Sequence, residues 1–229
     1  MKQEVASFLD YVAHSPTVFQ ATQQACDMLD AAGFTRLSEH EAWEILPGGR
    51  YYVTRNRSAL VAFAVPENGF THCQIVASHG DSPTFKLKAH AEGEAAGAYI
   101  RLDVEPYGGM IMSTWFDRPL SIAGRALVRE DGRLVTRLID LDRDAALIPN
   151  MPIHFNRDIN SGYSYNPQTD MLPLFGGKDA KGALAAEIAA KAGAKEEDVV
   201  ACDLFLYNRT PASVWGANEE FFSLSLIHI

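Results

Sequence analysis

Two helices are predicted at the start of the chain from the spacing of its apolar residues. In the first helix these residues recur at i, i+3, i+4 and i+7, which places them on one helix face. They are Val5, Phe8, Leu9 and Val12. The second helix is expected to start with Ser15 as its cap and Pro16 at its first position, and to end at Gly33, where glycine accepts a left-handed backbone.

Strands are predicted next, and one of them has the pattern of a fully buried strand. Segments 51–55 and 59–65 are rich in β-branched and aromatic residues and flank a polar turn at 56–58. In segment 73–78 the residues 75–77 are consecutive and apolar, which is typical of a strand that is covered on both faces between helices. Helices together with such a strand indicate an α/β layer.

From residue 85 onward, the pattern indicates strands with one polar face. Apolar and polar residues alternate at 85–90 and 100–105, and Asp131-Gly132 is a strong hairpin signal. Residues 90–175 are therefore expected to form an antiparallel β module without a long helix. The other elements expected here and beyond are strands at 120–129 and 133–140, a helix at 180–192 and a final strand at 200–207.

Length and composition are those of a globular protein. At about 150 residues per domain, 229 residues correspond to about one and a half domains. A hydrophobic fraction of 47% and a charged fraction of 21% exclude collagen-like, coiled-coil and wholly disordered chains. The net charge of −9 disfavours nucleic acid as a partner, because the chain also lacks a basic stripe that could override it.

Cysteine usage and the first residues favour a cytoplasmic location. The cysteines Cys26, Cys73 and Cys202 are odd in number and far apart, so neither a disulfide framework nor a CxxC metal site is indicated. The N-terminus carries Glu4 where a signal peptide would have its cationic and apolar regions, and no apolar run reaches the length of a membrane span. We therefore expect a reducing compartment and no membrane partner.

Candidate chemistry is concentrated directly after the predicted buried strand. In open α/β sheets, sites form at the carboxyl ends of strands, and His79 lies at such an end with Asp81 two residues on. A histidine there can bind zinc through one ring nitrogen while the carboxylate holds the other. The same residues equally fit a histidine that closes a strand beside a capping aspartate.

Other motifs carry less chemistry. Gly108-Gly109 and Gly176-Gly177 lack the spacing of a nucleotide-binding loop, and no Gly-x-Ser-x-Gly elbow is present. The adjacent acids Glu219-Glu220 are more typical of a solvated face or a helix start than of a catalytic pair.

Eight ordered blocks resemble the M18 family of metalloaminopeptidases, the aspartyl aminopeptidases. They are SPTVFQAT (15–22), GRYYVTRN (49–56), HGDSP (79–83), YGG (107–109), WFDR (115–118), AGR (123–125), IHFNR (153–157) and GANEEF (216–221). The resemblance covers nearly the whole chain up to Phe221. It implies a zinc-exopeptidase-type α/β catalytic domain, of which only the N-terminal part is present here, with an inserted β-rich dimerisation domain.

The resemblance also implies an activity and roles for three residues. Family members remove N-terminal, typically acidic, residues from peptides with a water activated by two zinc ions. His79 matches a zinc ligand and Asp81 the catalytic aspartate that orients it, while Gly80 replaces the threonine usual between them. His154 matches a histidine that reaches the substrate in a neighbouring subunit. The implied partners are peptide substrates and further copies of the chain, as dimers that assemble into a dodecamer.

The predicted domain organisation combines the pattern and the resemblance. The N-terminal part of the catalytic domain is expected at 1–88, the inserted β domain at 89–212, the return to the catalytic domain at 213–221 and a tail outside the family at 222–229. Because the family's later metal-ligand blocks do not follow residue 221, we expect an N-terminal fragment that is inactive alone. The short C-terminus fits either a truncated or frame-shifted gene or a natural short paralogue. The alternative function is a non-catalytic interaction module that co-assembles through the β domain.

Overall fold

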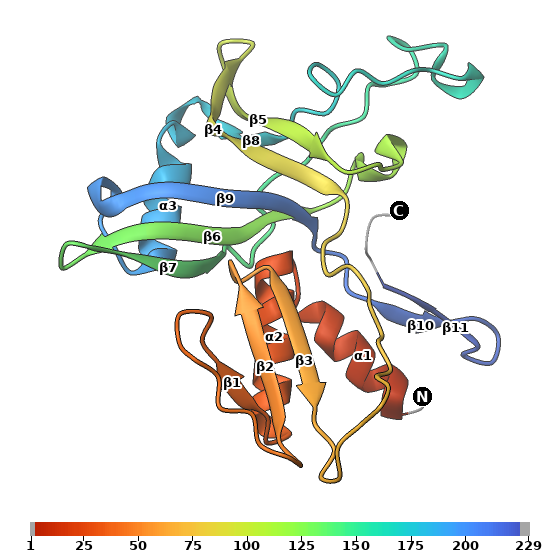
Figure 1. Cartoon of the computed structure of the whole chain (residues 1–229). Coiled ribbons are helices and arrows are strands. Elements are labelled where there is room, and N and C mark those ends of the chain that lie inside the picture. Colours follow the sequence, from red (N-terminus) through yellow and green to blue (C-terminus); the bar gives the residue numbers. More distant parts are fainter. Residues whose placement is uncertain (1–2, 225–229) are drawn as a thin grey trace. The chain divides into compact units, whose positions relative to one another are not determined.

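The computed structural model describes residues 3–224, and these form two compact units (Figure 1). One unit comprises residues 4–81, and the other begins at Ser82. The domain boundary predicted between residues 88 and 89 stays a prediction. The two units are considered separately below, because each has its own sheet. No helix among residues 3–224 is both long enough and apolar enough to cross a membrane.

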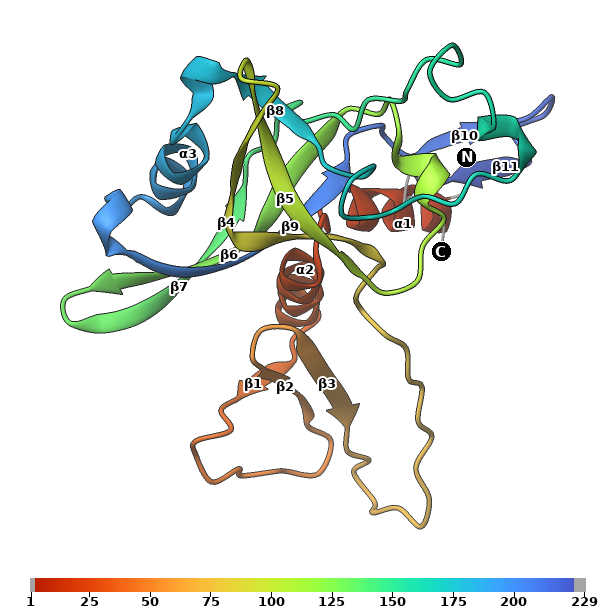
Figure 2. The ribbon, with the colours of Figure 1, turned by 90° about the horizontal axis from the view of Figure 1, so that it is seen from above.

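The first unit combines two helices with a small sheet. Its elements are α1 (Gln3–Ala13), α2 (Val18–Ala31), β1 (Thr35–Leu37), β2 (Arg50–Arg55) and β3 (Ala59–Ala64). Both predicted helices and the predicted hairpin of β2 and β3 are therefore confirmed. The short strand β1, which pairs parallel to β2, was not predicted. Figures 1 and 2 show α1 and α2 on one side of this sheet.

Helix α2 begins later than the sequence predicts. Thr17, with an extended backbone, is its cap, and the Thr17 hydroxyl accepts a hydrogen bond of 3.3 Å from the backbone N–H of Phe19. The prediction of Ser15 as the cap is wrong, since Ser15 lies two positions before Thr17. The predicted end is confirmed: Gly33 has φ +77° and its N–H donates to the Asp30 carbonyl.

The sheet of the first unit is attached to α2 through one buried tyrosine. The side chain of Tyr52 in β2 is fully buried, and its hydroxyl donates a 2.7 Å hydrogen bond to a carboxylate oxygen of Asp30 in α2. Burial and this hydrogen bond raise the pKa of Tyr52 to about 12. The hydroxyl thus stays protonated and continues to donate to Asp30 over the ordinary pH range.

The predicted buried strand at 73–78 is not a strand in this structure. The segment has no regular secondary structure, and Ile75 and Val76 are 80% and 92% exposed. In Figure 2 it lies within the long irregular connection from β3 to the next strand. A strand requires hydrogen-bonded neighbours and cover for its apolar side chains, and the residues that the structure describes supply neither to this segment.

The second unit is built on a six-stranded sheet in the order β7-β6-β9-β4-β5-β8, in which every neighbouring pair is antiparallel. Its strands are β4 (Thr84–Ala95), β5 (Tyr99–Tyr107), β6 (Leu120–Glu130), β7 (Arg133–Asp140), β8 (Leu174–Gly177) and β9 (Val199–Asn208). The predicted alternating strands and the hairpin at Asp131-Gly132 are confirmed. Among the described residues between 90 and 175, helical structure is limited to short 3-10 turns at Met112–Trp115 and Ile159–Ser161, as expected.

One face of the six-stranded sheet carries the core of the second unit. Its inward side chains are almost fully buried and come from five strands: Phe85, Leu102, Ile122, Ile139 and Leu206. Helix α3 (Ala183–Ala192) adds Leu184 and Ile188 to this core. The alternation of apolar and polar residues along each strand therefore determines which face is covered.

Helix α3 begins after residue 182, rather than at residue 180 as predicted. Gly182 has φ +86°, and residues Lys178–Ala180 form a separate 3-10 turn. The carboxylate of Glu92 accepts hydrogen bonds from the backbone N–H groups of Gly182 (2.6 Å) and Leu184 (2.8 Å). The pairing of β4 with β5 is interrupted by a β-bulge between Leu87 and Glu92, directly before this carboxylate. A carboxylate from a distant strand thus caps the helix.

On the opposite face, Asp203 joins three strands. Its carboxylate accepts hydrogen bonds from Arg125 in β6 at 2.8 and 3.0 Å and pairs with the ammonium of Lys86 in β4 at 3.1 Å. Burial alone would raise the pKa of Asp203, but the hydrogen bonds from Arg125 and Lys86 outweigh it and hold the pKa below its ordinary value. The ion pairs therefore hold β4 and β6 to β9.

The strands β6 and β9 approach so closely at Gly124 that no side chain fits there. Gly124 has φ +152°, and a Cβ atom at this position would lie 2.0 Å from the Asp203 carbonyl oxygen. Both the backbone conformation and the close contact require glycine.

We expect Gly124→Ala to lower the free energy of unfolding by about 3 kcal/mol, because it combines backbone strain with overpacking. Urea unfolding followed by circular dichroism measures this. Gly132→Ala is the matched control: φ is +74° but no atom lies within 4 Å of the added Cβ, so the cost should be about 1 kcal/mol. Equal costs for both variants would contradict the close approach.

Candidate metal centre

His79 and Asp81 form a hydrogen-bonded pair at the end of the irregular segment. The His79 side chain is 71% exposed. Its Nδ1 lies 2.9 Å from the backbone carbonyl oxygen of Asp81 and 3.2 Å from a carboxylate oxygen of the same residue. The carbonyl oxygen can only accept a hydrogen bond, so Nδ1 carries the proton. In the neutral ring, Nε2 then keeps the lone pair with which a histidine binds a metal.

This geometry depends on residues that are close in sequence. The two partners are separated by Gly80, at which an added Cβ would meet only Val18 Cγ2, at the ordinary contact distance of 3.9 Å. The backbone at Gly80 has no positive φ. The position therefore accommodates a side chain such as the threonine that the family resemblance implies, and the glycine does not disturb the His79–Asp81 pair.

The described residues do not contain a complete zinc site. Zinc centres in proteins use three or four protein ligands. Among residues 3–224, no group of three or more histidine, cysteine, aspartate or glutamate side chains is arranged to hold a metal ion. The chemistry of the His79–Asp81 pair fits one ligand of such a centre with its orienting carboxylate, but it does not fit a complete centre.

His154, the predicted substrate-binding residue, lies in an exposed loop of the second unit. The loop turns tightly at this point, with the Phe155 N–H donating to the Pro152 carbonyl at 2.9 Å. The neighbouring side chains Ile153 and Phe155 are exposed as well. The prediction that His154 reaches the substrate in a neighbouring subunit stays a prediction.

The acidic pair near the end of the described chain shapes a turn. Strands β10 (Ser213–Trp215) and β11 (Phe221–Ser223) form a two-stranded hairpin. The Glu220 carboxylate accepts hydrogen bonds from the backbone N–H (3.0 Å) and side-chain amide (2.8 Å) of Asn218. Hydrogen bonds from the backbone N–H groups of Asn218 and Glu220, followed by that from the Asn218 amide, lower the pKa of Glu220. Glu220 is thus engaged in the hairpin loop.

A comparison with protein-family models identifies the relationship. The model described as "Aminopeptidase I zinc metalloprotease (M18)" matches residues 11–226, which is most of the chain. The chain belongs to the M18 aminopeptidase family. The match ends inside the tail predicted at 222–229, of which residues 225–229 lie outside the described part of the structure.

The chain spans about half the length of the curated relatives that it matches. It is 41% identical to "Probable M18 family aminopeptidase 2" from Clostridium acetobutylicum, over 98% of its own length but 54% of that relative. Among solved structures, a chain of the cryo-EM complex of Ape4 and Nbr1 matches with a TM-score of 0.89 and 35% identity, over 95% of this chain and 46% of that one. The S. cerevisiae mApe1 dodecamer matches with a TM-score of 0.78 and 25% identity, over 96% and 51%. The mixed α/β fold is therefore the M18 fold over half of its length.

Excess zinc is expected to change the melting temperature of the 229-residue chain by less than about 1 °C, because a partial site gives little binding energy to the folded state. Differential scanning fluorimetry with and without zinc measures this. The variant His79→Ala is the control and should behave like the unchanged chain. A rise of several degrees that His79→Ala abolishes would show that the described residues bind zinc well.

Proposed function

We propose that this chain provides one metal ligand, His79, to the centre of a two-zinc aminopeptidase. The observation that carries the proposal is the contact of His79 Nδ1 with the backbone carbonyl oxygen and one carboxylate oxygen of Asp81, since it leaves Nε2 available as a ligand and restrains the ring. Zinc in such a centre would polarise the peptide carbonyl and activate water when bound. The contribution of this chain is to hold the ligand in its tautomer, with Asp81 as the positioning residue.

The proposed substrates are peptides with an acidic N-terminal residue. This specificity follows from the resemblance of the eight sequence blocks to aspartyl aminopeptidases. We further propose that His154 approaches the substrate in a neighbouring subunit, which its exposed loop position supports. A cytoplasmic location is proposed as well, and the free state of Cys26, Cys73 and Cys202 supports it.

The isolated chain is proposed to be inactive. A two-metal hydrolase needs several ligands on each metal, and residues 3–224 bring no group of three together. Family relatives extend well beyond the matched half, so the remaining ligands are proposed to belong to the part of the family sequence that this chain does not match.

The purified 229-residue chain, with zinc added, is assayed for release of N-terminal aspartate from a chromogenic substrate. We expect its rate to be at least about 1,000-fold lower than that of the full-length Clostridium acetobutylicum relative, because most of the metal ligands are absent. His79→Ala serves as the control for contaminating peptidases, since any activity that survives it comes from elsewhere. Zinc-dependent turnover that disappears in His79→Ala would contradict the inactivity.

A second candidate function is assembly without catalysis. The second unit has its own buried core and exposes Met151, Ile153 and Phe155 on one loop, which is consistent with a surface that meets another subunit. The S. cerevisiae relative is a dodecamer, and we propose dimers and higher assemblies through the β-rich unit here too.

Co-assembly predicts a joint species when the 229-residue chain and the full-length Clostridium acetobutylicum relative are refolded together and passed over a size-exclusion column. Phe155→Asp should weaken the joint species by about tenfold, because burying an unpaired carboxylate is costly. The matched control Leu134→Asp, at an exposed position on β7, should leave it unchanged. Separate elution of the two unchanged chains would exclude this candidate.

A further inference from the structure

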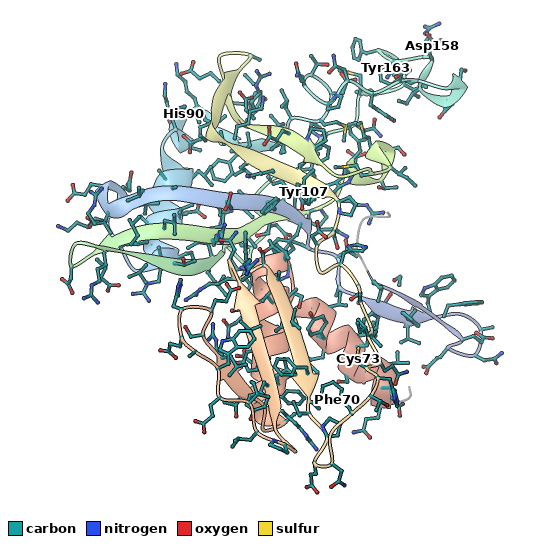
Figure 3. The ribbon with its side chains drawn as sticks, viewed as in Figure 1. Phe70, Cys73, His90, Tyr107, Asp158 and Tyr163 are labelled. Carbon is teal, nitrogen blue, oxygen red and sulfur yellow. The ribbon has the colours of Figure 1, made fainter. Side chains whose placement is uncertain are left out.

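Segment Cys73–Ser78 has the composition of a buried strand but is displayed on the surface of the first unit. Ile75 and Val76 are 80% and 92% exposed, and Phe70 just before them is 65% exposed. In Figure 3, the labelled Phe70 and Cys73 lie on the part of the ribbon that has no arrow. Consecutive exposed apolar residues of this kind mark a surface that another polypeptide covers.

The backbone of this segment is unpaired as well. Within the described chain, no backbone hydrogen bond joins residues 70–78 to another residue. The nearby strand β3 is hydrogen-bonded to β2 along one edge only, so its other edge also lacks a strand neighbour among the described residues. Unpaired peptide groups and an open sheet edge are the two features through which a further strand is added to a sheet.

Energetics explain why the segment needs a partner. Ordering the backbone of six residues costs conformational free energy. Burying the side chains of Ile75 and Val76 returns only part of that cost. Hydrogen bonds from neighbouring strands and additional apolar cover are needed for the balance to favour a strand. Both must come from outside the described residues.

We propose that the occupant of this surface is a polypeptide corresponding to the part of an M18 aminopeptidase that this chain does not match, and that Cys73–Ser78 becomes a strand when it binds. The chain matches over 98% of its own length but only 54% of the Clostridium acetobutylicum relative, so nearly half of that relative has no counterpart here. This inference rests on the proposed function, because the same polypeptide would bring the remaining metal ligands.

Strand formation would also immobilise the metal ligand. His79 directly follows Ser78, and its contacts to Asp81 fix the ring only relative to its own short turn. Once the backbone up to Ser78 is held in a sheet, the position of His79 becomes fixed relative to ligands on the neighbouring strands. Assembly of the sheet and completion of the metal centre are therefore one coupled event.

Co-expression of the tagged 229-residue chain with the unmatched C-terminal part of the Clostridium acetobutylicum relative tests this inference. The two should co-purify, and amide hydrogen exchange at residues 73–78 should slow by at least about tenfold compared with the chain alone. Failure to co-purify, or co-purification without slower exchange at 73–78, would overturn the inference. Self-association of the 229-residue chain that protects 73–78 without the added part would equally overturn it.

Variants of the segment separate strand formation from general destabilisation. Val76→Pro removes a backbone N–H that has no partner in the isolated chain, so melting should be unchanged while the protection on assembly is lost. Ile75→Lys should also abolish the protection on assembly, because the lysine side chain cannot be buried like isoleucine. Ile45→Pro, at an exposed loop position of the same unit, is the control and should co-purify normally. Protection that survives Val76→Pro, or is lost equally in Ile45→Pro, would overturn the proposal.

Peptidase activity of the co-purified complex distinguishes this inference from the proposed function. Slower exchange at 73–78 without hydrolysis of an N-terminal aspartyl substrate would support the strand and refute the proposed activity. Hydrolysis without slower exchange would support the activity and refute the strand.

Discussion

A β-strand is stable only when its peptide groups are paired and its apolar side chains are covered. The six-stranded sheet of the second unit meets this requirement, and segment Cys73–Ser78 of the first unit does not. Strand β9 meets it fully. It lies between β6 and β4, and its inward residues Leu204 and Leu206 are buried. Segment Cys73–Ser78 has a comparable apolar sequence but no paired neighbour within the described residues. Strand β9 therefore lies at the centre of a sheet, whereas segment Cys73–Ser78 is an irregular exposed connection.

The same constraint explains which elements could be predicted from the sequence. Helix α1 and the hairpin of β6 and β7 depend on spacing and turn residues within a short stretch, so local patterns reveal them. The first residues of α2 and α3 depend on which of several candidate side chains caps the helix. Thr17 caps α2. Glu92 in β4, which lies 90 residues before Gly182 in the sequence, caps α3. Such choices are made by tertiary contacts, which the local pattern does not contain.

The candidate site divides in a similar way. The His79–Asp81 pair could be predicted because its partners are two residues apart and their hydrogen bond is formed within one turn. The role of Asp203 in joining three strands was not predicted, because it requires knowing that Lys86, Arg125 and Asp203 become neighbours in the sheet. The proposed zinc centre would need further ligands from distant segments, and no pattern near His79 identifies them.

The cysteines of the chain allow the exposure of segment 73–78 to be measured directly. Cys73 is exposed, whereas Cys26 is buried in α2 and burial raises the pKa of its thiol. In the folded 229-residue chain, a thiol reagent followed by peptide mass mapping should label Cys73 at the rate of an unhindered thiol and Cys26 only on unfolding. Labelling of Cys73 as slow as that of Cys26 would show that the segment is already covered, and would contradict the incomplete sheet on which the proposed metal centre and its assembly depend.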